Sequence, residues 1–292
     1  MKFTGQPKHQ EIDMSIMHRA AYQDAELVEI FVEAILLLAK AVGAGRVMDT
    51  SGDGDAEQWA KEFLVGYGLL AIGEARSLLL LLCDGLNLNA RVHFRSLYEY
   101  QLKITLLLDD EEKVLAFRDA FAYEMRDFAT KLGKAPEEID AEIERVLGID
   151  DASVVTGTRE NKALGGTVKE QMKSDLQPEA RYLTTFSWAS QVSHGSVLAL
   201  NELAKVTDGK ANDFITVSTL DKKGNDLLYD ALWVIFQFVV LIEQEFSIGI
   251  PGSDDLIKRA NDLNTRLKIF TPEQEAAVKR LREEKRKREA DN

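Results

Sequence analysis

The chain has 292 residues, 45% of them hydrophobic and 29% charged, so it is long enough to bury a core of its own. Its single cysteine, Cys83, and its modest content of Gly and Pro exclude disulfide-stapled, collagen-like and low-complexity proteins. The net charge of −13 argues against a general nucleic-acid coat, because such proteins bind by neutralising phosphates. Basic residues gather after Lys279, so any contact with nucleic acid is expected only locally.

The residue types at hand predict neither a membrane protein nor a metalloprotein. Residues 1–14 contain no apolar run of signal-peptide length, which together with the lone thiol predicts a cytoplasmic location. The most apolar stretch, residues 227–242, is interrupted by Asp230 and Gln237, so we interpret it as a buried helix without membrane contact. No zinc-type Cys/His cluster occurs, and neither a metal nor a cofactor is expected.

Apolar residues recur at three- and four-residue spacing along the first half of the chain, which is typical of helices. This spacing predicts a helix over residues 12–42, ended by Gly43 and Gly45, and helical structure over 57–108 with a break at 84–87. Asp109 is expected to cap the next helix, which runs to about residue 132, and Pro136 to begin a short one. Residues 148–167 are polar and rich in glycine, so they are predicted to form a loop that is the most mobile internal segment of the chain.

The second half adds further helices and no strand rhythm. Helices are expected over 178–206 and 225–246, with one short extended piece at 213–220, and Thr271 is a strong helix start. We therefore predict an all-α fold, a helical bundle over residues 1–250 with a C-terminal helical extension over 251–292. Apolar residues between Leu256 and Phe270 form a heptad seam. We expect this seam and the charged helix after Pro272 to extend beyond the bundle and to offer a surface for self-association; the alternative is that the seam packs on its own domain.

The polar residues with most chemical content lie in the helix that follows the break. Arg91, Arg95 and Glu99 are spaced by four, so they share one stripe of that helix and Glu99 can brace Arg95. Because charged groups beside apolar neighbours need polar partners, a second stripe containing Ser190 and His194 is the best candidate to face them, with Tyr182 nearby. We expect Arg95, Glu99 and His194 to meet in space.

These residues also carry a resemblance. The stretch from Arg91 to Glu99, followed about a hundred residues later by Tyr182 and residues 190–195, resembles a family of uncharacterised all-helical prokaryotic proteins grouped under a domain of unknown function. The resemblance covers roughly residues 60–108 and 178–206. Such proteins look loosely similar to helical HEPN ribonucleases and toxins, which implies a defence or toxin-type system, such as antiviral defence. The chain departs from the HEPN pattern, because Arg91 and His93 are closer together than its Arg and His.

Two hypotheses of different classes remain. In one, His194, Arg95 and Glu99 are catalytic, and the phosphate or other ligand is bound by Arg91, Arg95, Tyr182 and Ser190; the reaction is metal-independent cleavage of RNA or a nucleotide. In the other, the same residues form a structural network that fixes helix register, and the protein binds a protein partner or forms a homo-oligomer. We favour the second, a partner-binding or regulatory protein, because ion networks arise without chemistry.

Overall fold

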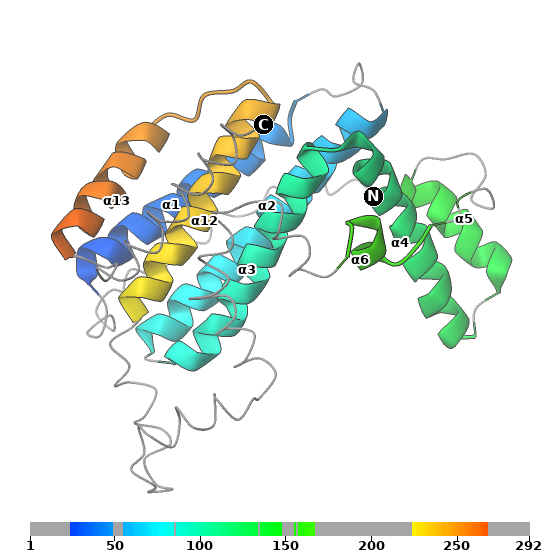
Figure 1. Cartoon of the computed structure of the whole chain (residues 1–292), viewed down its shortest axis with the longest axis horizontal. Helices are drawn as coiled ribbons and strands as arrows, with labels where there is room; N and C mark the ends of the chain where they lie inside the picture. The colour runs from blue at the N-terminus through cyan, green and yellow to red at the C-terminus, as the bar shows by residue number, and fades with distance from the viewer. Residues whose placement is uncertain are drawn as a thin grey trace, which may run out of the picture.

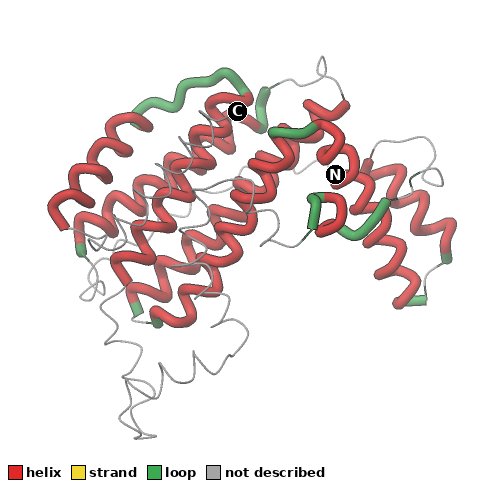
Figure 2. Tube along the Cα trace, in the orientation of Figure 1, coloured by secondary structure: helices red, strands yellow, loops and turns green. Residues whose placement is uncertain are grey.

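The computed structural model describes residues 24–48, 55–84, 86–133, 135–147, 155, 157–166 and 224–267. Throughout these ranges the regular structure is α-helical and no strand is present, so the predicted all-α fold is confirmed (Figure 2). The predicted helix at 178–206, the extended piece at 213–220 and the helix after Thr271 lie outside the described residues.

Most helices follow the local signals, but the first one begins at Ala25 and not near residue 12, because the backbone of Asp24 is extended and its carboxylate accepts a hydrogen bond from the backbone N–H of Leu27. The helices are α1 (Ala25–Gly45), α2 (Asp55–Cys83), α3 (Asn87–Leu108), α4 (Glu111–Lys131), α5 (Pro136–Leu147), α6 (Glu160–Ala163), α12 (Gly224–Glu245) and α13 (Ser253–Leu267). The predicted break between α2 and α3 and the start of α5 at Pro136 are confirmed. The cap of α4 is corrected by one residue: Asp110, in an extended conformation, accepts hydrogen bonds from the backbone N–H groups of Glu112 and Lys113.

A main bundle is built from α1, α2, α3, α12 and α13 (Figure 1). The helix α12 packs against α1, α2 and α3, while α2 and α3 form an antiparallel hairpin. Among the described residues, the largest fully buried side chains lie in this bundle, namely Tyr98, Tyr229, Phe31, Phe94, Phe236 and Phe238. Burial of such rings removes a large apolar area from water and supplies most of the stabilisation of the bundle.

The heptad seam is used within the chain. Leu256, Ala260 and Leu263 of α13 are buried in the main core, and α13 lies along α1. Two ion pairs fix this contact, Arg259 to Glu33 at 2.7 Å and Arg266 to Glu26 at 2.6 Å. The expectation that the seam extends beyond the bundle is therefore corrected for these three residues, which pack on their own domain because the core of the bundle buries them.

Two described helices, α2 and α12, are long and apolar enough to cross a membrane by length and composition alone. In α12, 67% of the most apolar window is buried inside the protein, as expected for the core helix predicted from the sequence. In α2 the buried share is only 33%. The apolar character of α12 is thus explained by its position in the core, whereas α2 keeps an exposed apolar face.

A smaller lobe consists of α4, α5 and α6 (Figure 1). Its core is a separate cluster of Ala122, Ala129, Ile139, Ile143, Leu147 and Val155. The predicted loop over 148–167 is corrected here, because its described part contains α6 and buries Val155 and Leu164. A Cβ added at Gly157 would lie 2.0 Å from the carbonyl oxygen of Asp119, so only glycine allows this close approach to α4.

Candidate functional site

The α2–α3 hairpin brings two pairs of side chains together across its seam. Glu74 of α2 faces His93 of α3, with 2.6 Å between Glu74 Oε2 and His93 Nδ1. Seven residues further from the loop on each helix, the rings of Tyr67 and Tyr100 lie with their centroids 5.5 Å apart. Within each pair, the two residues are equally far from the turn along their helices, as the register of an antiparallel hairpin requires. We call these four residues the hairpin seam.

The electrostatics of the hairpin seam are set by Glu74. Its carboxylate accepts hydrogen bonds from His93 and from the hydroxyl of Tyr100. The pKa of Tyr100 is raised, first by burial and then by the negative charges of Glu74 and Glu99. Burial also raises the pKa of Tyr67, with the neighbouring Glu160 adding to the effect. Both phenols therefore keep their protons at neutral pH and act as hydrogen-bond donors.

His93 is positioned for proton exchange. Because Glu74 holds its Nδ1 side, the Nε2 side is the one available to an incoming group, and a third of the side chain, 33%, is exposed. A carboxylate that orients an imidazole in this way is a recurring device of general acid–base catalysis, although the same pair also serves as a structural tie.

The predicted ion pair between Arg95 and Glu99 on α3 is confirmed. Arg95 Nε donates to Glu99 Oε1 at 2.8 Å, one turn apart, and both side chains are about a quarter exposed. Arg91, one turn earlier, is buried at 5% exposure. Since two residues advance a helix by about 200°, His93 and Arg95 lie on opposite edges of α3. The helix thus carries a histidine edge facing α2 and a separate arginine edge.

The sequence-predicted site is only partly within the described residues. Arg91, Arg95 and Glu99 are described, whereas Tyr182, Ser190 and His194 lie outside, so their meeting with Arg95 stays a prediction. Arg91 is buried on α3, which packs against α12, and the buried polar residues of the described part also include Asp230 of α12.

Sequence reasoning missed the hairpin seam, although a signal was available. Glu74 and Arg76 are the only charged residues between Glu62 and Asp84, in an otherwise apolar run. A charge in such a run calls for a partner, and the register set by the break at 84–87 places His93 opposite Glu74. Within the described residues, no group of three His, Cys, Asp or Glu side chains could hold a metal ion.

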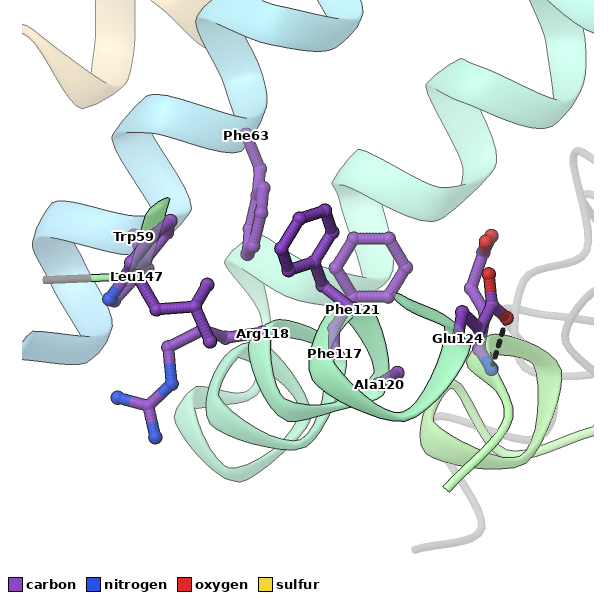
Figure 3. A pocket seen from close by; sticks show the side chains of 9 residues that line it. Trp59, Phe63, Phe117, Arg118, Ala120, Phe121, Glu124 and Leu147 are labelled. Carbon is purple, nitrogen blue, oxygen red and sulfur yellow. Dashed lines mark hydrogen bonds between the residues drawn. The ribbon is translucent and has the colours of Figure 1, made fainter. Parts of the chain in front are cut away.

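A cavity of about 280 Å³ lies beyond the far end of the hairpin seam, where α2 meets the smaller lobe (Figure 3). Trp59 and Phe63 reach it from α2, and Phe117 and Phe121 from α4. Glu160 of α6 also lines it and forms an ion pair with Lys103 of α3, which connects the cavity to the polar face of the hairpin.

Comparison with protein families shows a similarity over part of the chain. Residues 69–211 match the model of a family of unknown function (DUF5677). No curated protein and no solved structure matches the chain. The match starts in the middle of α2 and includes α3, α4, α5 and α6, so it contains Glu74, His93, Arg95 and Glu99. The expected resemblance to a family of unknown function is thereby confirmed at that level: the segment 69–211 is similar to DUF5677.

Proposed function

We propose that this protein acts by binding a partner protein through the exposed side of its α2–α3 hairpin. The observation that carries the proposal is the exposure of large apolar side chains there: Leu69, Leu70 and Leu80 of α2 are 46%, 51% and 46% exposed. Val92 of α3 adds a further 38%. We call Leu69, Leu70, Leu80 and Val92 the outer face. Large exposed apolar side chains on one side of a helix pair commonly mark interaction surfaces.

Two glycines on the same side of α2 fit a helical partner. Gly66 and Gly73 are one heptad apart, and a Cβ added at either would have nothing within 4 Å. Each glycine inside a helix costs about 1 kcal/mol relative to alanine, and no neighbour in the described structure requires their small size. Small residues beside leucines allow another helix to approach closely, so the occupant we propose is an apolar helix of another protein.

Binding is favoured over chemistry by the state of the polar residues. Glu74 is already engaged by His93 and Tyr100, and Arg95 by Glu99. Such a mutually satisfied network stabilises one helix arrangement without any ligand. The biological setting that we propose, from the HEPN-like resemblance, is a regulatory role in a cytoplasmic defence or toxin-type system.

Site-specific photocrosslinking tests the outer face directly. A photoreactive amino acid is placed at Leu70 or Leu80, with the same residue at Leu36 of α1 as control, because Leu36 and Leu80 are equally exposed at 46%. We expect crosslinks to one other protein from positions 70 and 80 and none from 36. The crosslinked protein is then purified, and its affinity is measured against the natural chain and against Leu70→Glu, which should weaken binding by about tenfold or more.

Three outcomes would contradict the proposal. Crosslinks from 70 and 80 only to a second copy of this chain would replace the partner by a homo-oligomer. Crosslinks only within the same chain would show that the outer face is covered by its own residues. Unchanged affinity of Leu70→Glu for the purified protein would remove the outer face from the interface.

A second candidate is the cleavage of RNA or a nucleotide without a metal, and the observation that favours it is the partly exposed side chain of His93, which Glu74 holds at Nδ1. In this version His93 joins the predicted acid–base group His194, and Arg95, braced by Glu99, holds the phosphate. Cleavage of a labelled RNA in excess EDTA is measured for the natural chain and for Arg95→Ala, His93→Gln and His194→Ala.

The enzymatic version requires that these variants lose cleavage by a hundredfold or so while the melting temperature stays within a few degrees. No cleavage by the natural chain, or equal cleavage by all variants, would reject it. A large fall in melting temperature in Arg95→Ala would instead identify the Arg95–Glu99 pair as structural.

A further inference from the structure

The cavity at the junction of α2 with the smaller lobe is walled by aromatic rings. Trp59 and Phe63 lie 5.5 Å apart between centroids, and Phe63 meets Phe117 edge to face at 5.0 Å. Phe121 also lines the cavity (Figure 3), and its side chain is 37% exposed, so it forms the solvent-exposed edge of the wall. A volume of about 280 Å³ is just below the roughly 300–1,000 Å³ that sites for drug-sized molecules occupy, so the cavity suits a small ligand.

The charged groups around this cavity are unequally placed. Glu124 and Glu160 stand together at one end, where Glu124 Oε1 accepts a hydrogen bond from the backbone N–H of Glu160 at 3.3 Å (Figure 3). Arg118 is the one cation in the described lining, and its guanidinium donates to Asp119 at 2.8 Å and 2.9 Å. In Figure 3 that guanidinium points away from the phenylalanine rings.

Negative potential at the acidic end extends beyond the two carboxylates. Glu160 forms an ion pair with Lys103, whereas within the described part no cation pairs with Glu124. The neighbouring Tyr67 shows the effect of this negative potential, because its pKa is raised by burial and, in addition, by the charges of Glu160 and Glu124. An occupant with a positive charge would therefore gain attraction at this end, while an anion would be repelled.

We propose that this cavity binds a small organic cation, an amine or quaternary ammonium group, between the aromatic rings and the carboxylate of Glu124. The faces of aromatic rings attract cations through their quadrupoles, and the attraction grows when the cation leaves water. Several rings arranged around a space with one carboxylate at its edge are the usual recognition device for such groups. The site is separate from the outer face, so it stands whether or not the proposed partner binding is correct.

Calorimetry on the full chain with a matched pair of probes tests this. Choline supplies a quaternary ammonium group, and 3,3-dimethylbutan-1-ol has the same shape without the charge. We expect choline to bind at least about tenfold more tightly than the alcohol, because only the cation gains from the rings and Glu124. Glu124→Gln keeps the hydrogen-bond acceptor while removing the charge, and it should weaken choline binding by about five- to tenfold.

Two further variants separate the site from general effects. Phe121→Leu removes one ring at the exposed edge of the cavity and should also weaken choline binding, with circular dichroism confirming an unchanged fold. Glu29→Gln removes a charge from the exposed side of α1 and should leave binding unchanged. Absent choline binding, equal binding of the neutral alcohol, or equal effects of Glu124→Gln and Glu29→Gln would each overturn the proposal.

Discussion

The main bundle and the α4–α6 lobe are held together by different interactions. The bundle buries whole aromatic rings, such as Phe94 and Phe236, at 1% exposure or less. The lobe has a core of six residues without an aromatic ring, two of them alanines. It is completed by polar ties, since Arg126 donates to Asp140 at 2.9 Å and to the carbonyl oxygen of Val155 at 2.7 Å.

From this difference we expect the lobe to unfold before the bundle. A small apolar core contributes little to stability. Individual hydrogen bonds and one close backbone contact therefore supply a larger share of the folding free energy in the lobe than in the bundle. The aromatic cavity lies between the two regions and takes walls from both. Variants that act on one region and spare the other can therefore break or sharpen the comparison.

The largest effect is expected from the core of the bundle. Phe94→Ala should lower the free energy of unfolding by about 3–5 kcal/mol, because it removes a fully buried ring, whereas Ile143→Ala in the lobe should cost about 2 kcal/mol. Hydrogen exchange should show that Phe94→Ala weakens protection in all described helices and that Ile143→Ala does so only in α4 and α5. If both variants weakened protection in the same helices, the lobe would not unfold as a separate unit.

A close second is the contact of Gly157 with α4. Gly157→Ala places a Cβ 2.0 Å from a backbone oxygen, so the segment must move, and we expect a loss of about 1–3 kcal/mol. The matched control is Gly73→Ala in α2, where space is open and removal of a helical glycine should add about 0.5–1 kcal/mol. Thermal unfolding of both variants decides; a neutral Gly157→Ala would show that the segment is loosely attached.

A smaller effect is expected from the polar tie of the lobe. Arg126→Met keeps the aliphatic stem but removes the hydrogen bonds to Asp140 and Val155, at a cost of about 1–2 kcal/mol. Amide exchange between residues 157 and 166 should accelerate, while α1 and α12 keep their protection. If amide exchange in α12 accelerated by the same amount, Arg126 would contribute to the stability of the whole chain and not of the lobe alone.

The smallest effect concerns the buried thiol of the bundle. Burial, with help from Asp84, raises the pKa of Cys83 from 9.0 to about 11. The folded state thus holds this proton more tightly, so its contribution to stability is complete below pH 9 and is lost as the pH rises towards 11. Between pH 6 and 8 we expect no change in melting temperature from this group, and alkylation by iodoacetamide should be far slower than in the unfolded chain. Fast alkylation of the folded protein at pH 8 would show that the bundle opens there.

Local signals were enough to predict most helices of the described part. Apolar periodicity located α12, and Pro136 located the start of α5, because each acts within its own helix. The cap of α4 shifted from Asp109 to Asp110, since neighbouring aspartates are equally suitable and only the backbone conformation chooses between them. The turn of α6 gave no periodic signal, because single contacts of Val155 and Leu164 order that segment.

The candidate site divides along the same line. By itself the sequence determined the Arg95–Glu99 brace, because a spacing of four residues on one helix fixes neighbours whatever the rest of the chain does. Only the tertiary structure decided that Glu74 meets His93, that the seam of α13 lies on α1, and that four aromatic rings surround a cavity. Those contacts depend on which helices pack together and in which register, and that choice is made by the burial of the whole core.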